Sequence, residues 1–147
     1  MVWGAISASG GINLLKVNLN ITQKVYSEII DRAILPQATS FAGPGWRLVQ
    51  DNCRVHLGSS LQDRLANHIL QLPAYSPDLN PMENLWGILT KKLFEGNEQF
   101  QDVNTLWTAL RKAWLEVVTG DLCHKLVHSM TDRCKAAVKA RGASIAY

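Results

Sequence analysis

A turn framed by two prolines constrains this chain most, because it fixes where a helix must begin. In the run Pro77-Asp78-Leu79-Asn80-Pro81 the prolines fix two backbone angles, and Asn80 is a favourable N-cap for a helix that starts at Pro81. Glu83 then falls in the first turn of that helix, at the spacing of a capping box with Asn80. Its carboxylate is either presented for function or simply bonds back to the Asn80 amide.

A second acid follows a short apolar run. The apolar run at residues 46–50 predicts a buried strand that ends just before Asp51. Ligands of α/β sheets usually bind where strands end, although for Asp51 taken alone an Asp-Asn turn that closes the strand is the simpler explanation. If Asp51 and Glu83 face one crevice, their charges repel unless a cation lies between them, which predicts a divalent ion with oxygen ligands.

Hydrophobic periodicity predicts an α/β domain. Two strands at residues 2–6 and 12–17 are joined by a glycine-bearing turn, and an amphipathic helix at residues 25–34 starts from a capping box at Asn20 and Gln23. Further elements are expected as a strand at 46–50, a helix at 59–67, a strand at 69–72, and helices at 81–94, 103–118 and 121–140. A chain of 147 residues with 47% hydrophobic residues fits a single domain spanning residues 1–147.

Composition restricts the environment and the partners. Three cysteines form no disulfide framework, and neither a signal peptide nor a membrane span is visible, so we expect an intracellular protein without membrane contact. The net charge is +3, and basic residues gather in the C-terminal helices. Such helices either contact a phosphate backbone or present ordinary solvated faces. The candidate DNA contacts are Lys91, Lys92, Arg133, Lys135 and Lys139.

Two long motifs carry a family resemblance. The run Val49-Gln50-Asp51-Asn52-Cys53-Arg54-Val55-His56, followed by Ser76-Pro77-Asp78-Leu79-Asn80-Pro81-Met82-Glu83-Asn84-Leu85-Trp86-Gly87, resembles the catalytic domain of Tc1/mariner-type transposases. The opening Met1-Val2-Trp3-Gly4-Ala5-Ile6-Ser7 is also similar to the family. So is the closing Ser129-Met130-Thr131-Asp132-Arg133-Cys134 with Gly142 and Tyr147. The resemblance therefore covers nearly the whole chain.

The resemblance implies an RNase H-like fold, a mixed sheet flanked by helices with a helical C-terminal part. It also implies a triad of acids that binds two Mg²⁺ (or Mn²⁺) ions, to which Asp51 and Glu83 would belong. Family members carry the first acid on a strand ahead of the segment like Met1–Gly4, whereas this chain has no acid before Glu28. We therefore expect a sheet lacking its first strand, an incomplete triad and no catalysis by this chain. A homodimer or a partner chain could supply the missing strand.

The implied parent activity is DNA cleavage and strand transfer on transposon ends and target DNA, in the nucleus or otherwise inside the cell. Three explanations of the incomplete triad stay open. The chain is part of a longer active transposase, a domesticated nucleic-acid-binding or protein-interaction scaffold that no longer uses catalysis, or a relic without function.

Other candidate residues have ordinary structural explanations. Asp78 and Asn80 are expected to shape the turn, and His56 to bond within its own loop, although in a working site it would lie near the phosphate. Four residues suggest zinc, but packing within the fold is the favoured explanation. They are Cys123, His124, His128 and Cys134. Trp86, Trp107 and Trp114 follow helical spacing and are expected in the core rather than stacking on bases.

Overall fold

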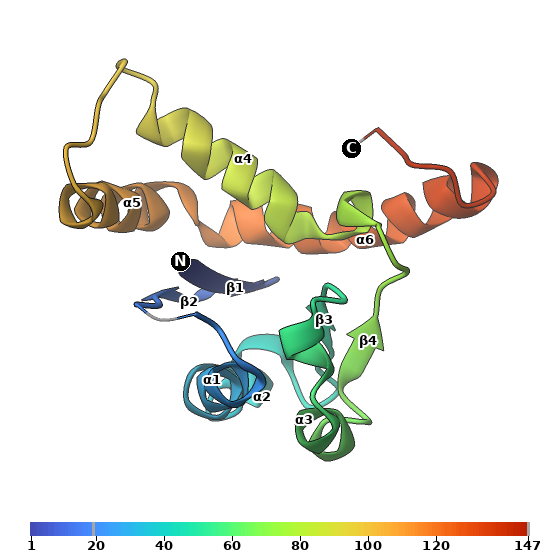
Figure 1. The fold of residues 1–147 in the computed structure, drawn as a ribbon. Coiled ribbons are helices and arrows are strands. Elements are labelled where there is room, and N and C mark those ends of the chain that lie inside the picture. The colour runs from blue at the N-terminus through green and yellow to red at the C-terminus, as the bar shows by residue number, and fades with distance from the viewer. Residues whose placement is uncertain (19, 147) are drawn as a thin grey trace.

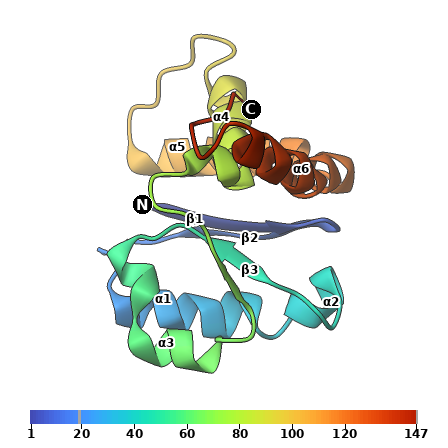
Figure 2. The ribbon, with the colours of Figure 1, turned by 90° about the vertical axis from the view of Figure 1, so that its right-hand side faces the viewer.

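The structure, a computed structural model, describes residues 1–18 and 20–146, and it has three layers (Figures 1 and 2). A β-hairpin forms the middle layer, with α4, α5 and α6 on one face and α1 and α3 on the other. The strands are β1 (Val2–Ser7), β2 (Gly10–Lys16), β3 (Leu48–Gln50) and β4 (Ile69–Gln71). The α-helices are α1 (Gln23–Ile29), α2 (Ala38–Ala42), α3 (Ser59–Arg64), α4 (Pro81–Leu93), α5 (Val103–Val117) and α6 (Gly120–Lys139).

The β1–β2 hairpin contributes to both hydrophobic clusters because its side chains alternate between two faces. Trp3 and Ala5 pack with α1 and α3, while Val2 and Ile6 pack with α4, α5 and α6. The strands are antiparallel, with a register shift between Ala5 and Ile6. Gly10, the first residue of β2, has φ +141°, a backbone angle that side chains rarely permit. The predicted glycine-bearing hairpin is therefore present.

The first helix begins differently from the prediction. Thr22 is the N-cap of α1, and its hydroxyl accepts a hydrogen bond from Val25 N–H at 3.3 Å. The predicted capping box of Asn20 and Gln23 is wrong, because Gln23 is already the first helical residue and Thr22 has the extended backbone that a cap needs. After α1 the chain continues as a π-helix over Ile30–Ile34, and α2 was not predicted.

The strands form two separate pairs instead of the single mixed sheet that was expected. β3 and β4 are parallel, with Leu48 opposite Ile69 and Gln50 opposite Gln71. Within the described residues no ladder joins the hairpin to this pair, although both contribute side chains to one cluster around Tyr26. In this part of the chain β1 and β3 each pair with a single strand, so each has an edge without a strand partner. Backbone groups at such edges favour a further strand.

The remaining elements lie within a few residues of the predicted bounds. The helix after β3 ends at Arg64 rather than residue 67, because the chain turns at Leu65, whose carbonyl accepts bonds from the His68 and Ile69 N–H groups. The helical C-terminal part is confirmed. Tyr147, part of the closing resemblance, lies outside the described residues. Over residues 1–18 and 20–146, none of the helices has the length and apolarity needed to cross a lipid bilayer.

Candidate active site

Asp51 lies immediately after β3, and its side chain is 59% exposed. Its Oδ1 accepts a hydrogen bond from the Cys53 N–H at 3.1 Å, which is the Asp-Asn turn considered as the structural alternative. The same oxygen lies 2.6 Å from His56 Nδ1. The predicted local bonding of His56 is thus present, and its partner is Asp51 itself. Asp51 is therefore both accessible to solvent and fixed in orientation.

A buried network lies behind this acid. The Tyr26 hydroxyl donates to Gln50 Oε1 at 2.6 Å, and Gln50 Nε2 donates to the His56 carbonyl at 3.2 Å. The rings of Tyr26 and His56 are in contact, with centroids 4.1 Å apart. Burial, reinforced by the nearby Asp51 and Cys53, raises the pKa of Tyr26 well above its usual range, so its hydroxyl stays a donor. The helical spacing of apolar residues in the sequence predicts only that Tyr26 is buried. It does not reveal the hydrogen bonds that connect Tyr26, Gln50 and His56.

The carboxyl ends of β3 and β4 lie at the same edge, because the two strands are parallel. Asn52 Nδ2 donates to the Leu72 carbonyl at 2.7 Å and ties the two strand ends together. Asp51 follows one of these ends, and the chain leaving the other reaches the turn Pro77–Leu79 and then α4. Asp51 therefore lies at the edge where ligands of α/β folds usually bind, and Glu83 lies further along the chain that leaves β4.

Glu83 lies in the first turn of α4, as predicted. Asn80 is the N-cap, and its Oδ1 accepts a hydrogen bond from Met82 N–H at 3.2 Å. The Asn80 side-chain Nδ2, rather than its backbone amide, donates to Glu83 Oε1 at 3.3 Å. The architectural role expected for Asn80 is confirmed, and the Glu83 carboxylate has a capping contact of the kind that its alternative explanation predicts.

The chemistry of the two acids suits a hard divalent cation, but their arrangement does not complete a site. Carboxylate oxygens are the ligands that Mg²⁺ and Mn²⁺ prefer. However, no group of three or more His, Cys, Asp or Glu side chains in the described part of the chain could hold a metal ion. Both acids also have local hydrogen-bond partners. Residues 1–18 and 20–146 by themselves therefore do not complete a two-ion centre, and the two acids remain candidates for holding a single ion.

The five candidate DNA contacts differ in exposure. Lys91, Lys92, Lys135 and Lys139 are exposed, as a phosphate contact needs. Arg133 is only 2% exposed, and its guanidinium donates to Ser129 Oγ and to the Asp78 carbonyl. Its burial argues against direct DNA contact. A signal for this was present in the sequence, because position 133 continues the buried stripe of α6 that contains Cys123 and Leu126.

The remaining candidates are divided between core and surface. Trp114 is buried and Trp86 and Trp107 pack against the same cluster, so the core prediction is confirmed. Cys123 is fully buried, and burial raises the pKa of its thiol. His124, His128 and Cys134 are exposed, so the expected packing is wrong for these three. The two histidine rings contact each other at a centroid distance of 4.0 Å.

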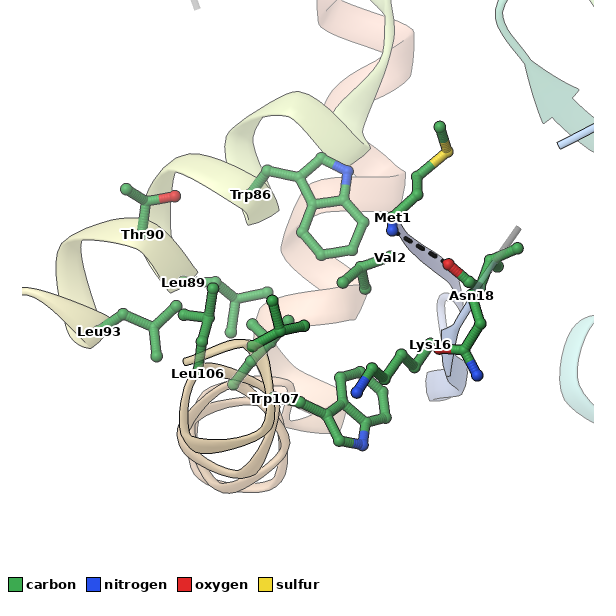
Figure 3. A pocket seen from close by; sticks show the side chains of 13 residues that line it. Met1, Val2, Lys16, Asn18, Trp86, Leu89, Thr90, Leu93, Leu106 and Trp107 are labelled. Carbon is green, nitrogen blue, oxygen red and sulfur yellow. Dashed lines mark hydrogen bonds between the residues drawn. The ribbon is translucent and has the colours of Figure 1, made fainter. Parts of the chain in front are cut away.

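An apolar pocket of about 490 Å³ lies between the open end of the hairpin and helices α4 and α5 (Figure 3). Trp86, Leu89 and Leu93 of α4 face Leu106 and Trp107 of α5 across it. Its polar side chains are Lys16 and Asn18 at the hairpin end and Thr90 of α4. The Lys16 amine donates to Asn104 Oδ1 at 2.8 Å. Neither Asp51 nor Glu83 lines this pocket, so it is separate from the candidate site.

The layered architecture is that of a mixed α/β domain, and its likeness to solved structures gives the RNase H-like fold type. The fold matches the crystal structure of the catalytic domain of Mos1 mariner transposase, with a TM-score of 0.74 and 20% identity over 99% of this chain and 82% of that chain. The same Mos1 domain with raltegravir and Mn gives a TM-score of 0.73 at 20% identity, with the same coverage. A Mos1 paired-end complex with the left transposon end gives 0.73 at 24% identity, over 99% of this chain and 44% of that chain.

Sequence comparison establishes the family. The profile described as DDE superfamily endonuclease matches residues 1–107. The Tc3 and Tc1 transposases of Caenorhabditis elegans are each 31% identical to this chain and aligned with all of it, covering 45% and 54% of their own lengths. The chain therefore belongs to the DDE superfamily, and over its whole length it is similar to transposases of the Tc1/mariner type. It spans about half the length of these relatives.

Proposed function

We propose that this chain contributes Asp51 and Glu83 to the active site of a transposase that cuts and joins DNA at transposon ends, in the nucleus or otherwise inside the cell. The observation that carries the proposal is topological. Asp51 follows β3, the chain that leaves its parallel neighbour β4 leads to Glu83, and the Asn52 side chain joins the two strand ends. Structures of the similar Mos1 transposase were solved with Mn and with a transposon end, which supports a metal-binding role for the two acids next to DNA.

The 147-residue chain alone is proposed to be inactive. Phosphoryl transfer of this class needs two metal ions to stabilise the negative charge of the transition state, and two acids do not hold and position both ions. Within the described residues, no third acid joins Asp51 and Glu83. Nicking of transposon-end DNA by the pure chain with Mg²⁺, lost in Asp51→Ala, would show that the chain is active and would refute this part of the proposal.

We propose that an additional strand inserts between β1 and β3 and completes the sheet. The support is the pair of separate two-stranded sheets, whose side chains share one cluster while no ladder of the described residues connects them. The strand comes from another segment of the transposase, from a second copy or from a partner chain. The chain by itself should then be poorly soluble or self-associated. A clean monomer in sedimentation, with one cooperative thermal transition, would contradict this expectation.

The metal role of Asp51 is tested by thermal unfolding of the chain with increasing Mn²⁺. Ligand binding stabilises the folded state by about 1.4 kcal/mol when the free ligand is ten times its dissociation constant. We expect stabilisation of the parent chain that is reduced in Asp51→Asn and in Glu83→Gln. Asp63→Asn, which changes an exposed acid of α3, is the matched control and should behave like the parent. Equal stabilisation of Asp51→Asn and Asp63→Asn would remove Asp51 from the proposed site.

The exposed lysines are proposed to contact DNA phosphates. In the described residues Lys92 pairs with Glu95 and Glu116, and Lys135 pairs with Asp132, whereas Lys91 and Lys139 take part in no ion pair. Each phosphate contact contributes about 0.9 to the slope of log affinity against log salt.

The double change Lys91→Gln and Lys139→Gln should therefore weaken duplex binding and lower that slope by roughly 2. Lys24→Gln, on α1 beyond the hairpin, is the control. Unchanged binding in the double variant would exclude Lys91 and Lys139 as phosphate contacts.

The second candidate function is a scaffold that binds DNA without catalysis. It is favoured by the local hydrogen bonds that already occupy both acids. On this alternative, DNA binding is unaffected by chelation of divalent metal, and Mn²⁺ stabilises Asp51→Asn as much as the parent.

A further inference from the structure

Arg133 is a charged side chain in the interior of the protein, with 2% of its surface exposed. Its Nε–H donates to Ser129 Oγ at 2.9 Å on the same helix, and its Nη1–H donates to the backbone carbonyl of Asp78 at 2.8 Å. A buried guanidinium is tolerated when its donors are satisfied, and a charge-assisted bond to a carbonyl is stronger than a neutral one. Helix α6 is thereby tied to the proline-framed turn before α4.

A second contact holds the same turn. The Ile145 backbone N–H donates to Asp78 Oδ2 at 2.8 Å. The chain returns to the turn after α6 because Arg141 and Gly142 both adopt left-handed backbone angles, with φ of 53° and 83°. The hydrogen bond from Ile145 lowers the pKa of Asp78, which keeps this carboxylate ionised and accepting at neutral pH.

These contacts bear on the placement of Glu83 because little freedom lies between Asp78 and α4. The chain forms a 3₁₀ turn over Pro77–Leu79, and Asn80 then caps α4 and donates to Glu83 Oε1 at 3.3 Å. Pro81 fixes a further backbone angle. If Asp78 moves, the cap and the first turn of α4 move with it.

We propose that Arg133 and Asp78 are positioning residues that hold the first turn of α4, and with it Glu83, in its place at the active site. This inference rests on the proposed function of Glu83. It assigns a role to the closing segment 129–145, which lies outside the residues 1–107 matched by the family profile. Arg133 therefore acts on catalysis through Glu83 and not through DNA.

The local part of the proposal is tested by hydrogen exchange of the backbone amides at residues 79–85. Arg133→Met removes the hydrogen bond from α6 to the Asp78 carbonyl, and Asp78→Ala removes the hydrogen bond between the Ile145 N–H and the Asp78 carboxylate. In each variant, exchange in this segment should accelerate by about 10- to 100-fold relative to the parent, with a smaller change in α1. Lys125→Met, an exposed change on the same helix, is the matched control and should leave the segment unchanged. Arg133→Lys should rescue in part, because a lysine amine lacks the planar guanidinium that reaches both Ser129 Oγ and the Asp78 carbonyl.

The functional part is tested by Mn²⁺ titration at a temperature where every variant is folded. Loss of a group that orients a metal ligand weakens metal affinity by about 10-fold or more, so Arg133→Met should raise the apparent dissociation constant by this factor while Lys125→Met does not. If the parent itself shows no Mn²⁺ effect, the proposed function of Glu83 has failed, and so has the positioning role that rests on it. Two other outcomes would overturn the positioning role of Arg133 and Asp78 without affecting the proposed function. In one, residues 79–85 exchange no faster in Arg133→Met and Asp78→Ala than in Lys125→Met. In the other, exchange rises as much in α1 as in residues 79–85.

Discussion

Replacement of Tyr26 by phenylalanine tests whether the buried network supports Asp51. Tyr26 is 2% exposed, and its hydroxyl donates to Gln50 Oε1 at 2.6 Å. The change removes one donor and leaves the ring in place, so the buried Gln50 oxygen loses a partner. An unsatisfied buried acceptor costs about 1–3 kcal/mol. For a chain of this size, the melting temperature should fall by roughly 3–12 °C.

The assay is chemical and thermal unfolding of Tyr26→Phe beside Tyr75→Phe. Tyr75 is fully exposed, so its change removes the same atom without creating a buried unsatisfied group. We expect Tyr75→Phe to match the parent within experimental error. If Tyr26→Phe is as stable as Tyr75→Phe, the Tyr26–Gln50 hydrogen bond contributes nothing net, and the argument that it supports the loop of Asp51 is refuted.

The same hydroxyl predicts a stability change at alkaline pH. The pKa of Tyr26 is raised in the folded state, so above pH 10 the unfolded chain releases this proton while the folded chain keeps it. The unfolded state then binds fewer protons, and stability falls as pH rises. The free energy of unfolding should therefore fall less between pH 9 and pH 11 in Tyr26→Phe than in the parent, as measured by urea unfolding at the two pH values.

Three further predictions concern packing and charge. Gly4→Ala should cost about 1–3 kcal/mol in urea unfolding, because a Cβ there would lie 2.9 Å from the Trp86 ring and force a shift in the core. Leu89→Ala, at 1% exposure, should cost about 2–5 kcal/mol, while Leu115→Ala, at 78% exposure, should cost far less. The Asp78 pKa is lowered on folding, so its stabilising contribution is present above its unfolded pKa and is lost as pH falls through the folded value. An acid titration of stability should therefore be shallower in Asp78→Ala than in the parent.

Local patterns were sufficient to predict most of the elements. Asn80 and Pro81 define the start of α4 through interactions within four residues, and the structure places that start where the sequence does. The cap of α1 could not be decided in the same way. Asn20 and Thr22 are both acceptable caps, and a difference of two residues is settled by how the helix packs rather than by the cap itself.

Contacts between distant residues could not be predicted. Arg133 and Asp78 are separated by 55 residues, and a basic residue on a helix is usually exposed. The basic character of α6 therefore indicated DNA contact, whereas its helical position indicated the core. For Arg133, the helical position was the better guide. Tyr26 and Gln50 show the same limit, because alternation and helical spacing identify buried positions but do not reveal which buried polar groups meet.

The two acids of the candidate site are supported by different layers of the molecule. Asp51 is oriented by His56 and the buried Tyr26–Gln50 pair beside α1, whereas the turn leading to Glu83 is held from α6 and from the segment after it. Besides the β3–β4 ladder, the Asn52 side chain connects the two supports at the strand ends. A strand inserted between β1 and β3 would join the layers through a full set of backbone hydrogen bonds. The part of the fold that would complete the sheet is therefore also the part that would fix how far apart the two carboxylates lie.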